Sequence, residues 1–137
     1  MAFEYLPHTA DIKIQAEAET LPEAFSEAAR AVTHIMTEEE IRCESAFAVS
    51  LEAESVEALF FEFLSEIILL LDTEGLFVCR ADLEVTQKSG VWTLSGKVLG
   101  DKAKHYVRHG DVKAPTYHDL FVEERTGSWR VRATLDI

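Results

Sequence analysis

WRVRATLDI, residues 129–137, decides the fold. Its side chains alternate between apolar and polar, which is the pattern of a β-strand with one buried face. We expect the odd-numbered residues in the core and the even-numbered residues on the opposite face. A packed strand would hold the Asp136 carboxylate, the Ile137 carbonyl and the terminal carboxylate together. Oxygen ligands gathered in this way suit a hard divalent cation.

Further elements precede this stretch. The same alternation at residues 10–18 and 46–54 predicts two strands. Between them, Thr20 and Glu23 form a capping-box pattern that predicts a helix over about 21–37. A second, strongly apolar helix is expected from 56 to about 72. Its uninterrupted apolar run is far shorter than the ~20 residues of a membrane span.

From residue 76 onward the pattern is that of strands. Residues 76–87 and 91–99 predict one hairpin, and residues 117–124 and 128–137 predict another. The polar residues 100–110 between them predict a mobile loop. The resulting order, βαβαββββ, predicts an α+β fold in which two helices pack on a mostly antiparallel sheet or on a pair of sheets. The 137 residues suit a single domain, 1–137.

Charge is distributed unevenly along the chain. The formal net charge of −12 argues against broad nucleic-acid binding through a basic surface. Residues 1–75 carry 17 acidic and 3 basic side chains, whereas residues 76–137 carry 8 and 10. Two interpretations stay open: ordinary solvated acidic helices, or an acidic surface that faces a basic protein partner.

Other features indicate a cytoplasmic protein. Cys43 and Cys79 do not form a closely spaced pair, so we expect two reduced thiols. The first residues contain neither the basic region nor the apolar region of a secretion signal. No membrane association is expected.

The catalytic motifs of common enzymes do not occur in the sequence. There is no Gly-x-Ser-x-Gly elbow and no glycine-rich phosphate loop. His105 and His109 are four residues apart, but the adjacent Gly-Asp pairs favour an exposed loop over a metal-binding helix. His8 and His118 are of more interest, because each lies beside an aspartate at the end of a predicted strand.

Two aspartates form the best candidate site. Asp11 begins the first predicted strand and Asp136 ends the last, both on the face opposite the apolar residues. If these strands are antiparallel neighbours, the start of one lies beside the end of the other. Two carboxylates a few ångströms apart repel each other, so either the pKa of one of them is raised or the pair binds a cation. The plainer alternative is a pair of solvated acidic residues.

Three segments together resemble the archease family: HTADI at 8–12, VKAPTYH at 112–118 and LDI at 135–137. The resemblance covers the full chain. It implies a small α+β protein that is not a stand-alone enzyme but a cofactor of the RtcB-type RNA ligase, which joins RNA ends in tRNA splicing and RNA repair. Such a cofactor promotes ligase guanylylation and multiple turnover, contacts RNA only through the ligase, and has no small-molecule substrate.

The resemblance also implies a bound divalent metal ion, calcium in known examples, at Asp11, Asp136 and the Ile137 carbonyl. Lys113 matches a family position tied to activity, and His8 and His118 lie in the motifs and are expected to serve partner contact or activity. Two other functions stay open. One is a chaperone-like or scaffolding module with an acidic binding surface. The other is a metal-dependent phosphoester hydrolase with one of these two histidines as its base.

Overall fold

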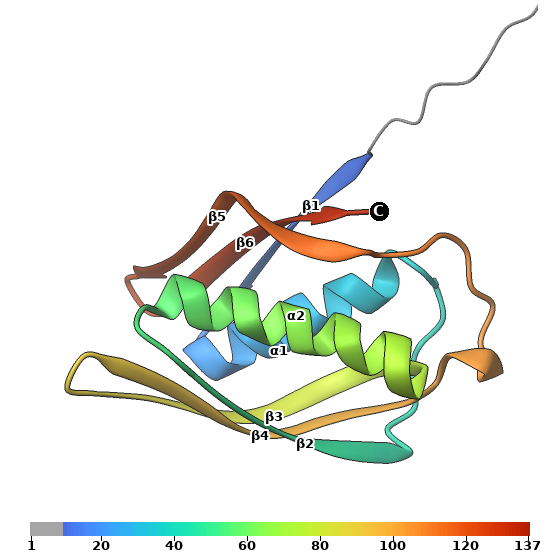
Figure 1. Cartoon of the computed structure of the whole chain (residues 1–137), viewed down its shortest axis with the longest axis horizontal. Coiled ribbons are helices and arrows are strands. Elements are labelled where there is room, and N and C mark those ends of the chain that lie inside the picture. The colour runs from blue at the N-terminus through green and yellow to red at the C-terminus, as the bar shows by residue number, and fades with distance from the viewer. Residues whose placement is uncertain (1–9) are drawn as a thin grey trace, which may run out of the picture.

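The computed structural model describes residues 10–137, and within them it contains six strands and two long helices in the order βαβαββββ (Figure 1). This confirms the predicted α+β class and element order. The elements are β1 (Asp11–Ala18), α1 (Leu21–His34), β2 (Ser45–Ala53), α2 (Val56–Glu74), β3 (Leu76–Lys88), β4 (Val91–Lys102), the short 3-10 helix η1 (Ala103–His105), β5 (Ala114–Arg125) and β6 (Ser128–Asp136).

The two helices lie between two antiparallel sheets (Figure 1). Sheet A has the strand order β1-β6-β5, and sheet B has the order β2-β4-β3. Of the two predicted arrangements, the pair of sheets is therefore the correct one. In sheet A the central strand is β6, so the stretch that decides the fold pairs with a strand on each side.

Helix α2 is apolar over most of its circumference because sheets cover it on two sides. The Ser55 hydroxyl accepts a hydrogen bond from the Ala58 N–H, and Gly75 ends the helix in the left-handed conformation. Its buried residues are Leu59, Phe60, Phe63, Leu64, Ile67, Ile68, Leu70 and Leu71. Among the described residues, no helix has the length and apolar character that crossing a membrane requires.

Helix α1 covers part of the free edge of β3. The Ser26 hydroxyl accepts a hydrogen bond from the Ala81 N–H (2.9 Å), and the Thr33 hydroxyl accepts one from the Val78 N–H (2.9 Å). An uncovered strand edge is a template for unwanted pairing with other chains. The two buried hydroxyl groups therefore hold α1 in place and protect this edge.

Cys43 and Cys79 form a disulfide, so the prediction of two reduced thiols is wrong. Their Cα atoms are 5.7 Å apart although the residues are separated by 36 positions. Cys43 lies just before β2, and Cys79 lies at a bulge of β3 where the register with β4 shifts. The two cysteines are close because β2 and β3 belong to the same sheet. Their spacing along the sequence does not reveal this.

The predicted mobile loop at residues 100–110 is wrong at its beginning. Strand β4 continues to Lys102, and η1 follows it directly. Asp101 is only 3% exposed, and its carboxylate accepts hydrogen bonds from the Tyr106 hydroxyl and the Lys102 N–H, each at 2.8 Å. Polar residues of this segment thus donate hydrogen bonds to a buried carboxylate. Composition alone does not distinguish such a segment from a solvated loop.

The disulfide should contribute measurably to stability. A cross-link that closes a loop of this length restricts the unfolded chain and typically contributes about 2–4 kcal/mol to the free energy of unfolding. We expect the variant Cys43→Ser/Cys79→Ser, and the wild type in reductant, to lose about this amount in urea denaturation. The double variant should itself be insensitive to reductant. Equal urea midpoints for the oxidised and reduced wild type would contradict this expectation.

Candidate functional site

Strands β1 and β6 place Asp11 directly opposite Asp136. The Ile137 N–H donates to the Ala10 carbonyl at 3.1 Å, so these two residues form a hydrogen-bonded pair of the ladder. The adjacent pair, Asp11 and Asp136, is then a non-hydrogen-bonded pair. Facing Cα atoms in such a pair are about 4.5 Å apart and their side chains approach most closely. The predicted juxtaposition of the first and last strands is therefore present.

The two carboxylates are not compensated by an ion pair with any of the described residues. Asp11 is exposed and Asp136 is half-buried. None of the ion pairs formed within residues 10–137 includes either side chain. Like charges directly opposite each other destabilise a ladder. A shared cation would remove this repulsion.

Backbone groups at this end of sheet A complete the candidate site. The Lys113 N–H donates to the Asp136 carbonyl at 2.8 Å, which places Lys113 beside the aspartate pair with an exposed side chain. Ile137 directly follows Asp136. Within the described residues no three His, Cys, Asp or Glu side chains gather in a metal-binding group. A cation here would therefore need backbone or water oxygens besides the two carboxylates, which is a set that hard cations accept.

Of the two histidines in the sequence motifs, His8 and His118, the structure describes only His118. His8 lies outside the described residues. His118 lies on β5 with its side chain 70% exposed, and its Nε2 is 3.5 Å from Asp119 Oδ2. Here β5 bulges, because residues 117–120 stand opposite the single residue Ala133 of β6.

Sequence reasoning missed an ion pair between Lys13 of β1 and Asp119 of β5. Since β6 separates these strands and Thr134 is the β6 partner of Lys13, the ion pair crosses β6 over Thr134. Thr134 is accordingly only 1% exposed. The hydrogen bond from Lys13 lowers the pKa of Asp119 below its usual value, and the nearby His118 adds to this effect. The alternation predicts that Lys13 faces outward, but no sequence signal identifies the bulge that brings Asp119 to it.

Hydrogen bonds around the buried Asp101 carboxylate hold η1 and Tyr106 in place, in the segment that precedes Lys113. Asp101 Oδ1 is 3.2 Å from His105 Nδ1, and Asp101 Oδ2 is 3.8 Å from Arg42 Nη2. The Tyr106 hydroxyl donates to Asp101 and accepts from the Arg42 N–H at 3.0 Å. The hydrogen bond from Tyr106 is the largest cause that lowers the pKa of Asp101. His105 thus binds a buried carboxylate, and no metal-binding pair with His109 on a helix is present.

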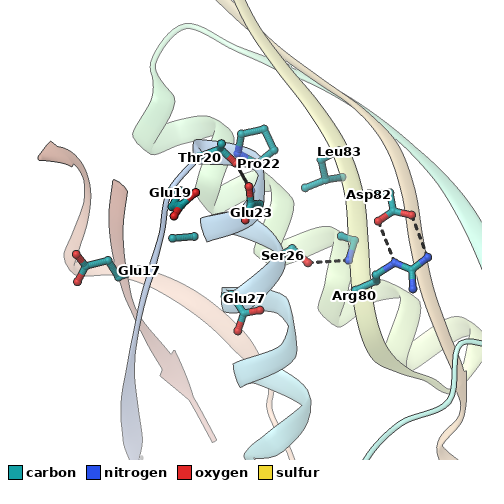
Figure 2. A pocket seen from close by; sticks show the side chains of 12 residues that line it. Glu17, Glu19, Thr20, Pro22, Glu23, Ser26, Glu27, Arg80, Asp82 and Leu83 are labelled. Atoms are coloured by element: carbon teal, nitrogen blue, oxygen red, sulfur yellow. Dashed lines mark hydrogen bonds and ion pairs between the residues drawn. The ribbon is translucent and has the colours of Figure 1, made fainter. Parts of the chain in front are cut away.

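An open groove lies at the other end of β1. It has a volume of about 960 Å³ and runs between the first two turns of α1, the end of β1 and the middle of β3. Figure 2 shows acidic side chains from β1 and α1 around it, and Asp82 paired with Arg80 at 3.0 Å. The groove thus carries part of the acidic charge of the sequence; its acidic residues are Glu17, Glu19, Glu23, Glu27 and Asp82.

Comparison with known proteins identifies relatives over nearly the whole chain. The sequence model of the Archease protein family matches residues 3–137. The chain is 35% identical to a protein named archease from Pyrococcus furiosus, over 98% of each chain. It is 30% identical to another from Methanosarcina mazei, over 98% of this chain and 95% of the relative.

Two solved structures share the fold. The solution structure of protein 1598 of Methanobacterium thermoautotrophicum has a TM-score of 0.78 and 24% identity over 96% of each chain. A crystal structure from Thermotoga maritima, described as an archease and possible chaperone, has a TM-score of 0.59 and 20% identity over 100% of this chain and 98% of that one. At these identities the similarity concerns the fold alone.

The facing aspartates give a prediction about the protein without metal. Replacing Asp11 with Asn removes one of two opposed charges, so in chelator we expect a gain of roughly 0.2–1 kcal/mol in the free energy of unfolding. The control is Asp72→Asn on the exposed surface of α2. Thermal or urea denaturation measures both. A loss of stability in Asp11→Asn relative to the control would mean that the two carboxylates do not repel each other.

The Asp101 network gives a prediction about acid stability. Because the folded-state pKa of Asp101 is lowered, its contribution is present above the unfolded pKa of about 3.9 and is lost as the pH falls through the lower folded value. Tyr106→Phe removes the hydrogen bond that chiefly lowers the pKa of Asp101. Acid unfolding of this variant should therefore begin at higher pH. Circular dichroism during acid titration measures this shift. Tyr117→Phe on β5 is the control, and coincident acid transitions of wild type and Tyr106→Phe would contradict the assignment.

Proposed function

The chain belongs to the archease family, and from this membership we propose that it is a divalent-metal-binding cofactor protein that activates an RtcB-type RNA ligase in tRNA splicing and RNA repair. The observation that carries the proposal is the facing pair Asp11 and Asp136. The proposed metal is calcium, and RNA is contacted only through the ligase. The proposed location is the cytoplasm, and it follows from the proposed ligase partner, because the Cys43–Cys79 disulfide removes the argument from reduced thiols.

The residues at this end of sheet A are suited to an oxygen-liganded cation. Asp11, Asp136 and the Ile137 carbonyl would hold it. Carboxylate and backbone carbonyl oxygens are ligands that a hard divalent cation accepts.

The proposed action takes place at the ligase active site. The acidic end of sheet A docks there, with Asp11 and Asp136 presenting their carboxylates to the reaction centre. Asp11, Asp136 and the Ile137 carbonyl would hold a divalent cation, which would supply positive charge to phosphate oxygens during guanylyl transfer. Lys113 lies beside the pair with an exposed side chain, so its ammonium group is available to a phosphate or to an acidic group of the ligase. The exposed His118 takes part in the same contact.

One observation favours a second function. The acidic groove at the opposite end of β1 offers a surface for a basic client protein, and the Thermotoga maritima relative is described as a possible chaperone. A chaperone-like module would depend on groove residues such as Glu19 and Glu23. It would not depend on Asp11 and Asp136.

Ligase guanylylation at limiting ligase tests the main proposal. We expect the wild-type protein to stimulate guanylylation and turnover, and we expect chelator to abolish the stimulation. Asp11→Asn and Asp136→Asn should lose it because each removes a metal ligand. Lys113→Met should reduce it while metal binding, followed by calorimetry, stays intact.

Two controls separate the alternatives. Asp72→Asn removes one negative charge from the surface of α2 and should stimulate like the wild type. Glu19→Lys/Glu23→Lys reverses the charge of the acidic groove and should matter only to a chaperone-like module. Incubation of the protein with RNA in the absence of ligase should give no turnover, whereas a hydrolase would give some. Full stimulation by Asp11→Asn and Asp136→Asn would overturn the proposal.

A further inference from the structure

We propose that Asp119 sets the charge of the Asp11–Asp136 site by holding Lys13 away from it. This inference rests on the metal-binding part of the proposed function. It assigns Asp119 as a positioning residue that acts through Lys13. The bulge of β5 is the structural device that brings its carboxylate into place.

Lys13 can reach the aspartate pair. It lies two residues from Asp11 on the same face of β1. It is also the diagonal neighbour of Asp136, because its direct partner is Thr134. Diagonal neighbours in a sheet are about 7–8 Å apart, within reach of long side chains. The Lys13 ammonium group therefore has acidic partners in two directions, and in the structure it pairs with Asp119.

The bulge of β5 makes the ion pair between Lys13 and Asp119 possible. Residues 117–120 leave the regular ladder between Thr116 and Phe121, and Asp119 adopts a φ of +54°. This left-handed conformation is tolerated by aspartate and asparagine far better than by most residues. In this conformation the Asp119 side chain extends across β6 and its carboxylate contacts Lys13. Thr134 is buried beneath the resulting ion pair.

Without Asp119, Lys13 would become the counter-ion of the site. On this face of the described residues, Asp11 and Asp136 would then be the nearest acidic groups that form no ion pair, because Glu17 is already paired with Arg130 at 3.2 Å. The ammonium group would neutralise part of their charge, and an incoming divalent cation would have to displace it. With Asp119 in place, the two carboxylates keep their full charge for an external ion.

The other cations near Asp119 do not replace Lys13 in this role. His118 is mostly exposed, and its Nε2 is 3.5 Å from Asp119. Arg132 donates two hydrogen bonds to Gln15 Oε1, at 2.7 and 3.0 Å, and lies over the Phe121 ring at 4.7 Å from its centroid. Lys13 is therefore the cation that Asp119 chiefly controls.

A double-mutant cycle read by calcium titration calorimetry tests the inference. Asp119→Asn keeps the backbone preference and removes the charge, so we expect calcium affinity to fall about tenfold, or about 1.4 kcal/mol. Lys13→Met should bind calcium at least as tightly as the wild type. Adding Asp119→Asn to Lys13→Met should then have little further effect, because there is no ammonium group left to release.

Glu123→Gln is the matched control. It also removes one negative charge from β5, where Glu123 pairs with Arg125 at 3.1 Å and not with Lys13. Its calcium affinity should stay within about twofold of the wild type. Equal effects of Asp119→Asn and Glu123→Gln, or an undiminished effect of Asp119→Asn in Lys13→Met, would overturn this inference alone. Failure of the wild type to bind calcium would overturn the proposed metal site, and this inference with it.

Discussion

The antiparallel pairing of β1 with β6 is the constraint on which the rest depends. Its register is fixed because the inward residues of β6, such as Val131 and Leu135, are buried against the helices. A slip by one residue would turn them toward solvent and turn the polar residues into the core. The same register places Asp11 opposite Asp136. The free energy of core packing thus holds together two carboxylates that repel each other.

This arrangement separates structural from functional parts of the molecule. Apolar residues on the inner faces of both sheets and on the helices form the core, whereas the candidate metal ligands lie on the outer face and at the end of sheet A. The β5 bulge and the Lys13–Asp119 ion pair connect this outer face across all three strands of sheet A. The acidic groove lies at the other end of β1, so it is separate in space from the candidate metal ligands.

Period-two and helical patterns predicted the fold well because they report burial, which is a local property of each segment. They also placed Asp11 and Asp136 on the outer face, and the family resemblance linked them to a metal. Features that depend on irregular backbone were not predictable. The Cys43–Cys79 disulfide forms at a bulge of β3, the Lys13–Asp119 ion pair depends on a bulge of β5, and residues 100–110 gave no sign that Asp101 is buried.

Paramagnetic broadening of backbone amide signals by Mn²⁺ tests the central claim most directly, because it locates a divalent ion on the folded protein. If β1 and β6 build a shared site, substoichiometric Mn²⁺ should first broaden the amides of Asp11, Lys113 and Ile137, and Asp136→Asn should abolish this effect. First broadening at Glu19 and Glu23 in the acidic groove, with the amides at the end of β6 unchanged, would contradict the account.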